Sequence, residues 1–156
     1  MHKILISIDY SPSAQIVAEL GNQIATSLQA EVHLLHVVNS INYYLVNDYS
    51  PIMGFSGFLY NTTTMPNVAE YITSTAYEFL LKTKEHLHNA DMHAIVKDGN
   101  TADVILETVK DIKATMIIMG SHSKQWLEQM LLGSTTHKVL HHSSIPVLII
   151  PVNKIM

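Results

Sequence analysis

The chain has 156 residues, a net charge of −4 and nine basic residues, all of them lysines. An acidic chain without arginine is a poor candidate for nucleic-acid binding, because arginine makes the bidentate contacts to phosphates and guanines. The chain has no cysteine, which excludes disulfides, thiolate metal sites and thiol redox chemistry. Hydrophobic residues make up 47% and charged residues 14%, a balance that favours strands buried on both faces, as in a parallel sheet.

The N-terminal segment does not resemble a signal peptide, because Asp9 interrupts its apolar run. No stretch of about eighteen apolar residues occurs that could span a membrane. We therefore expect a cytoplasmic protein. Its length predicts one domain over residues 1–156.

Apolar runs and helical periodicities alternate along the chain. Ser11 is expected to cap the first helix, with Pro12 in its first turn. The apolar residues of this helix repeat at helical spacing and are expected to form one apolar stripe, made of Ile16, Leu20, Ile24 and Leu28 with Val17 beside them. The predicted strands cover residues 3–9, 31–39, 92–97, 115–120 and 145–152, and the predicted helices carry apolar positions at 16–28, 68–87, 105–112 and from 134 onward.

This alternation predicts an α/β fold built from βαβ units, with a five-stranded parallel sheet and helices on both faces. Unusual polar and glycine residues follow the first and fourth strands, at Asp9 and Gly120. Ligands of such sheets bind beyond the carboxyl ends of the strands, where the strand order reverses. A strand order of 3-2-1-4-5 would bring these two turns to one crevice.

The stretch MGSHSKQWLEQMLLGSTTHK, residues 119–138, contains the strongest functional signal. Gly120 ends a strand, and Gly133 precedes small hydroxyl residues that open a helix. Free N–H groups and the positive end of a helix dipole favour a phosphate. A purely structural interpretation also remains open, in which Gly120 ends the strand, Ser134 caps the helix, and no ligand binds.

The stretch resembles the ATP-binding motif of the universal stress protein family: Gly, two residues, Gly, nine residues, Gly, then Ser or Thr. The segments ILISIDYSPSA, LLHVV and LLGSTTHKVLHHSSIPVLIIPV resemble other parts of that family. The resemblance implies a Rossmann-like fold of the adenine nucleotide alpha hydrolase type. This chain departs from the motif at Ser123, where the family has a glycine, and at Trp126, where ATP-binding members usually carry a small residue.

The resemblance implies a site for ATP, or for AMP or ADP, with Mg²⁺. Asp9 would contact the adenosine or help to hold the Mg²⁺, the main chain at Val37 would meet the adenine, and Gly120 would lie against the ribose. The residues implied in nucleotide binding are Ile8, Asp9, Val37, Met119, Gly120, His122, Ser123, Lys124, Gly133, Ser134 and Thr135.

Three functions stay open at this point. The first is an ATP-binding stress-response module with little or no catalysis. The second is a dimeric member of the same family that binds no nucleotide and acts through protein partners. The third is a small α/β enzyme, at most a slow ATPase, because no positioned base or Walker A motif is apparent.

The histidines do not predict a metal site. His137 and His141 are four residues apart on the last helix, with His142 adjacent, but a third ligand at defined spacing is missing. His36 is expected to be a hydrogen-bonded structural residue rather than a base.

Two further features concern the surface. Residues 40–66 have no counterpart in the family pattern, and we expect them to form a lid that orders on nucleotide binding. The last strand, with Val147 to Val152, is expected at the edge of the sheet, where family members commonly form homodimers.

Overall fold

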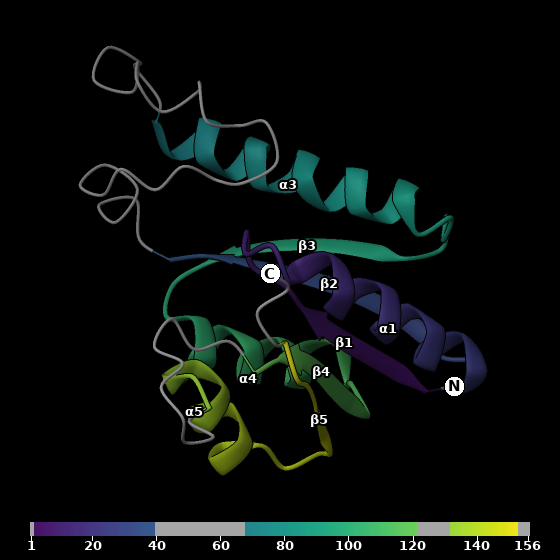
Figure 1. The fold of residues 1–156 in the computed structure, drawn as a ribbon. Helices are drawn as coiled ribbons and strands as arrows, with labels where there is room; N and C mark the ends of the chain where they lie inside the picture. The colour runs from purple at the N-terminus through teal and green to yellow at the C-terminus, as the bar shows by residue number, and fades with distance from the viewer. Residues whose placement is uncertain (1, 40–67, 122–131, 153–156) are drawn as a thin grey trace.

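The strands and helices alternate along the chain in the computed structural model, which describes residues 2–39, 68–121 and 132–152 (Figure 1). In chain order the elements are β1 (Lys3–Ser7), α1 (Ala14–Ser27), β2 (Glu31–Val38), α3 (Val68–His86), β3 (His93–Asp98), α4 (Thr101–Ile112), β4 (Met116–Gly120), α5 (Ser134–His142) and β5 (Val147–Ile150). No helix within these ranges combines the length and the apolar character needed to cross a membrane.

The five strands form one parallel sheet in the order β3-β2-β1-β4-β5, which confirms the predicted order. β1 is the central strand, and the chain turns to opposite sides of it to build the two halves of the sheet. In the register of β1 and β4, Ser7 lies opposite Met119. The carboxyl ends of these two strands therefore lie next to each other at the same end of the sheet.

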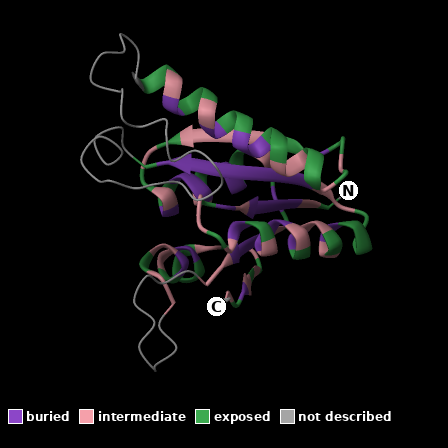
Figure 2. Cartoon of the chain, turned by 45° about the horizontal axis from the view of Figure 1, so that its top comes forward, coloured by how far each residue is buried: buried purple, intermediate pink, exposed green. Residues whose placement is uncertain are grey.

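Helices cover both faces of the sheet, as predicted (Figure 1). On one face, residues of α1 and α3 pack with β1 and β2 in a cluster that includes Ile6, Leu34 and Leu80. On the other face, α4 and α5 pack over Leu5 and Ile117. Figure 2 shows the strands buried in the middle layer, while the outer sides of the helices are exposed. The near-continuous apolar runs of the strands follow from this double coverage.

The buried face of α1 differs from the predicted stripe. Leu20 is 40% exposed and Leu28 is 47% exposed, so the prediction was wrong for these two residues. Val17 is buried as predicted, and Ile16 and Ile24 are partly buried against the core. The remaining buried positions of the helix are small residues, at Ala14, Ala18, Gly21 and Ala25. A Cβ atom added to Gly21 would lie 2.8 Å from Cδ1 of Ile6. The helix therefore approaches the sheet closely, and only a face of small side chains permits this.

Several predicted boundaries also shift. The N-cap of α1 is Ser13, not Ser11, because the chain makes a turn between β1 and the helix. The N-cap of α5 is Gly133 rather than Ser134. β5 ends at Ile150, so the predicted strand to Val152 is two residues too long, since Pro151 has no N–H group for a ladder.

Some predictions fall outside the described residues. These are the proposed lid at residues 40–66 and the central part of the nucleotide motif, which contains His122, Ser123, Lys124 and Trp126.

Candidate functional site

The candidate site begins where the buried strand β1 ends. Ile8 is the first residue after β1 and is buried. Its N–H group donates a hydrogen bond of 3.0 Å to the carbonyl oxygen of Leu35 in β2. The chain therefore stays attached to the sheet as far as Ile8 and leaves it only at Asp9.

Asp9 lies in a tight turn that links β1 to α1. One of its carboxylate oxygens, Oδ1, accepts a hydrogen bond of 2.9 Å from the N–H of Ser11. The hydroxyls of Ser11 and Ser13 are also 2.9 Å apart. This Asx-type turn fixes the carboxylate at the end of the strand. Because Asp9 is exposed, its remaining acceptor positions are open to a ligand.

His36 holds this turn from the neighbouring strand. It is almost completely buried, and its Nδ1 lies 3.0 Å from the carbonyl oxygen of Ile8. Burial lowers the pKa of His36, although the bond to Ile8 and the charge of Asp9 oppose this shift. A neutral imidazole must donate its Nδ1–H here, because a carbonyl oxygen can only accept. The prediction that His36 is a hydrogen-bonded residue is confirmed.

Aromatic rings pack around His36. The ring of Tyr10 lies 4.3 Å from the imidazole, and it meets the ring of Phe79 edge-on at 4.9 Å. Tyr10 directly follows Asp9. Its contacts with His36 of β2 and Phe79 of α3 therefore hold the turn in place on the side that leads to α1. Sequence reasoning did not identify these contacts, because Phe79 is 69 positions away from Tyr10 and no local pattern connects them.

Gly120 ends β4, beside the β1 turn, and it needs to be small. A Cβ atom at this position would lie 3.1 Å from Cγ2 of Val17 in α1, which is tighter than ordinary packing. The backbone does not require a glycine here, because Gly99 is the only glycine among the described residues with a positive φ. In the structure, the close neighbour of Gly120 is a helix of the same chain, while its contact with a ribose stays a prediction.

The residues after Gly120 are tied to β5. The N–H of Ser121 donates to the carbonyl oxygen of Ile150 at 3.0 Å. Its hydroxyl oxygen accepts a bond of 3.2 Å from the N–H of Val152. The first residues of the motif are thus held at the edge of the sheet.

The first turn of α5 faces this strand end. The buried hydroxyl of Thr136 donates a hydrogen bond of 3.1 Å to the carbonyl oxygen of Gly120. Its hydroxyl thus points toward the sheet and is not open to a ligand. Thr136 therefore fixes the distance between the helix and β4, a role that the sequence did not indicate.

The N-terminus of α5 carries no counter-charge of its own. Gly133 is the N-cap and offers no side-chain bond, and the first turn contains no acidic residue. The N–H groups of Ser134 and Thr135 precede the first i→i−4 bond, which His137 donates to Gly133. Ser134 is exposed and Thr135 is half-buried. Such a helix end can bind an anion.

The structure thus brings together most of the described residues that the motif implied. Ile8, Asp9, Met119 and Gly120 lie at the adjoining ends of β1 and β4. Val37 lies in β2, opposite Lys97 of β3, and its side chain is buried. Only its main chain is therefore in a position to meet a ligand. Gly133, Ser134 and Thr135 are joined to this group through Thr136.

Comparison with known proteins gives a consistent result. Residues 1–151 match the sequence model of the universal stress protein family. Universal stress protein MJ0577 of Methanocaldococcus jannaschii is 29% identical over 95% of this chain and 93% of that protein. Universal stress protein YxiE of Bacillus subtilis is 28% identical over 96% of this chain and 98% of that protein.

Solved structures extend the likeness to the fold. A structure of MJ0577 has a TM-score of 0.72 at 27% identity and covers 98% of this chain and 97% of that chain. A universal stress protein solved in complex with cAMP has a TM-score of 0.66 at 15% identity, over 97% of this chain and 98% of that chain. At that identity, the second comparison bears on the fold alone.

Proposed function

The chain belongs to the universal stress protein family, and on this premise we propose that it binds an adenine nucleotide between the turn after β1 and the N-terminus of α5. The nucleotide is ATP, or AMP or ADP, with Mg²⁺ when phosphates are present. The protein serves as a cytoplasmic module in the cellular response to stress.

The hydrogen bond from Thr136 to Gly120 carries this proposal. It fixes the anion-receptive N-terminus of α5 beside the end of β4, where the motif begins. The free N–H groups of this helix end can therefore approach the phosphates of a ligand that lies at the ends of β1 and β4. The first turn of α5 has neither a carboxylate nor a side-chain cap. If Gly120 and Gly133 served the fold alone, the helix would have no need to leave this end uncapped.

The roles at the site follow from its charges. Asp9, at the β1 turn, accepts from a ribose hydroxyl or holds the Mg²⁺ of a bound nucleotide. The N–H groups of Ser134 and Thr135 take the phosphates, together with Ser123 and Lys124 from the motif.

The proposal includes little or no catalysis. A slow ATPase is the alternative, and turnover at or above about 1 s⁻¹, the low end for dedicated enzymes, would contradict the proposal. Release of inorganic phosphate from MgATP measures this directly.

The first experiment is to denature the purified protein and chromatograph the small molecules that it releases. The nucleotide-free protein is then titrated with MgATP by calorimetry. Release of adenine nucleotide or saturable binding supports the proposal. The absence of both overturns the proposal and favours the alternative function, a dimeric stress protein that binds no nucleotide and acts through protein partners.

The variant Ser134→Asp locates the site. A carboxylate in the first turn of α5 repels a phosphate but complements the helix dipole, so binding should weaken at least about tenfold while stability rises by about 0.3–1 kcal/mol. Because affinity should fall while stability rises, weaker binding by this variant cannot be explained by a loss of folding. The control Ser144→Asp adds the same charge in the turn beyond the far end of α5, and it should bind like the wild type. Equal affinities in all three proteins would place the nucleotide elsewhere.

A second proposal concerns assembly. β5 is an edge strand, and Leu148 in it is 38% exposed. An apolar edge strand favours pairing with another copy of the chain. We propose a homodimer through β5, which would also support a function through protein partners.

A further inference from the structure

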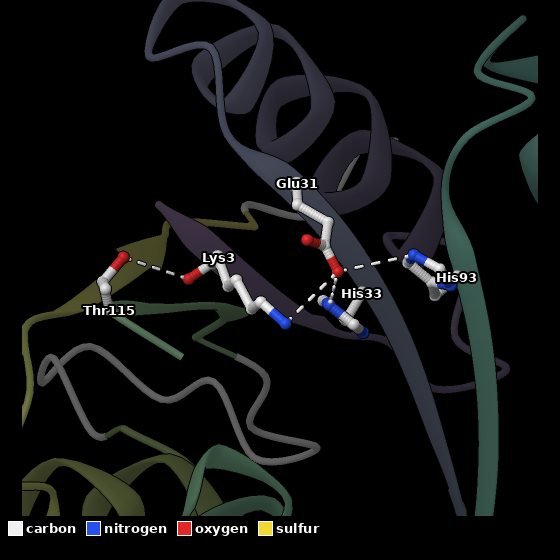
Figure 3. Close-up of polar contacts among 5 residues, drawn as sticks. All are labelled: Lys3, Glu31, His33, His93 and Thr115. Atoms are coloured by element: carbon white, nitrogen blue, oxygen red, sulfur yellow. Dashed lines mark hydrogen bonds and ion pairs between the residues drawn. The ribbon is translucent and has the colours of Figure 1, made fainter. Parts of the chain in front are cut away.

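A cluster of histidine and glutamate side chains lies at the amino-terminal edge of the sheet, at the opposite end of the strands from the nucleotide site. It contains Glu31 and His33 from β2 and His93 from β3 (Figure 3). One carboxylate oxygen, Oε1 of Glu31, lies 2.7 Å from Nε2 of His33 and 3.4 Å from Nε2 of His93. Among the described residues, this is the only group of three potential metal ligands.

Strand geometry creates the cluster. Glu31 and His33 are two residues apart on β2, so their side chains leave the same face of the sheet. His33 and His93 are direct partners in the register of β2 and β3. Their rings stack with centroids 4.7 Å apart and an angle of 17°. Both Nε2 atoms therefore point toward the same carboxylate, as Figure 3 shows.

We propose that Glu31, His33 and His93 form a second ligand site that binds a divalent transition-metal ion such as Zn²⁺. Two imidazoles and one carboxylate are a common ligand set for zinc and for non-haem iron. The three ligand atoms lie within 4.8 Å of one another. Ligands of a tetrahedral zinc ion are about 3.3 Å apart, given bonds of about 2.0–2.1 Å.

Two of the three separations between ligand atoms are close to that geometry. The separation of Glu31 from His93 already matches it, whereas the contact with His33 is a hydrogen bond and must open by about half an ångström. The metal takes the position of the shared proton. His33 is 8% exposed and hence held in place, while His93 is 56% exposed and leaves a path to solvent.

Lys3 competes with the metal. Its Nζ lies 3.6 Å from Oε1 of Glu31, so the ammonium neutralises the carboxylate and repels a second cation. The carbonyl oxygen of Lys3 accepts hydrogen bonds from the main chain and hydroxyl of Thr115, so only the side chain is free to move. Displacing it toward solvent opens the site, and removing its charge should strengthen metal binding.

The affinity is expected to be lower than that of a zinc site whose histidines are all hydrogen-bonded. Metal-binding histidines usually donate their second ring N–H to a partner. Nδ1 of His33 is buried and has no hydrogen-bond partner among the described residues. Binding at Nε2 leaves the proton on this nitrogen, which weakens the site.

The histidines of α5 provide an internal control. His137 and His141 stack at 6.3 Å, and Nδ1 of His142 is 2.9 Å from the carbonyl oxygen of Lys138. These residues can bind zinc weakly through one or two imidazoles, so a measurement must separate them from the cluster on the sheet.

The experiment is calorimetric titration of the full chain, without a histidine tag, with ZnCl₂ in a buffer that does not chelate zinc. The variants are His93→Gln, Lys3→Met and the double control His137→Gln with His141→Gln. We expect one zinc site per chain at this cluster. His93→Gln should weaken it at least about tenfold, Lys3→Met should strengthen it, and the double control should leave it unchanged.

A second readout is the melting temperature with and without ZnCl₂, which should rise in the wild type and not in His93→Gln. Two results would overturn the inference: no saturable zinc binding by the wild type, or equal zinc binding by the wild type and His93→Gln. Neither result depends on whether the chain binds a nucleotide.

Discussion

His36 links β2 to the turn after β1 through a single imidazole. It is buried, it donates to the carbonyl oxygen of Ile8, and its Nε2 has no hydrogen-bond partner among the described residues. A buried imidazole of this kind resists protonation, because the charged form would lose its hydration. The residue that shapes the β1 turn therefore also makes folding sensitive to pH.

Stability should fall as the pH drops below about 6.5, the value for an unfolded histidine. Burial lowers the pKa of His36 in the folded chain, so the unfolded state binds the proton first and gains stability relative to the folded state. His33, whose pKa burial also lowers, contributes in the same direction. Urea denaturation between pH 7 and pH 5 measures this dependence.

The variant His36→Gln isolates the contribution of His36. A glutamine amide can still donate to Ile8, but it does not titrate. The loss of stability between pH 7 and pH 5 should therefore be smaller than in the wild type. His141→Gln, at an exposed position on α5, is the control. Identical slopes for His36→Gln and the wild type would contradict this account.

At the scale of single elements, the helices differ in how their first turns are satisfied. The side chain of Asn100 caps α4 by accepting a hydrogen bond of 3.3 Å from the N–H of Asp103. The N-caps of α1 and α5, Ser13 and Gly133, make no such bond. The first turn of α4 thus has a side-chain cap and an acidic residue, Asp103. The first turns of α1 and α5 have neither.

The variant Asn100→Ala should lower the free energy of unfolding by about 1 kcal/mol, because it removes the cap while leaving the extended backbone of this residue allowed. Ser13→Ala is the matched control at the N-cap of α1 and should cost less, since the Ser13 side chain makes no cap bond and pairs, within the described part of the chain, with the hydroxyl of Ser11. Denaturant titration of both variants gives the two values. Equal costs would show that the Asn100 bond does not stabilise the helix.

At the scale of the whole molecule, the parallel sheet has two edges that differ in cover. β3 lies at one edge and packs against α3, whereas β5 lies at the other. β5 is a short strand of four residues, with Pro146 before it and Pro151 after it. The prolines restrict pairing to the segment between them, which contains the exposed Leu148.

The variant Leu148→Glu should convert the proposed dimer to a monomer, because it places a charge on the edge that two copies would share. Sedimentation velocity at micromolar concentration measures the change. Leu140→Glu, at an exposed apolar position on α5, is the control and should leave the dimer intact. A wild-type monomer under these conditions would contradict assembly through β5.

The sequence by itself determined the order and type of the elements and the parallel sheet. Buried runs such as that of β1, and glycine and hydroxyl residues such as Gly120 and Ser134, are local signals, and the strand order followed from where they occurred. These features depend on neighbours in the chain, so periodicity and turn chemistry report them. The predicted strand order likewise placed Asp9 and Gly120 at neighbouring strand ends, as the structure has them.

Only the tertiary structure decided which side chains meet across the sheet. The inward turn of Thr136, the burial of small residues on α1 in place of Leu20, and the cluster of Glu31 with His93 all depend on elements far apart in the chain. Strand register and the close approach of a helix set these contacts, and both arise from packing of the complete core rather than from any local preference.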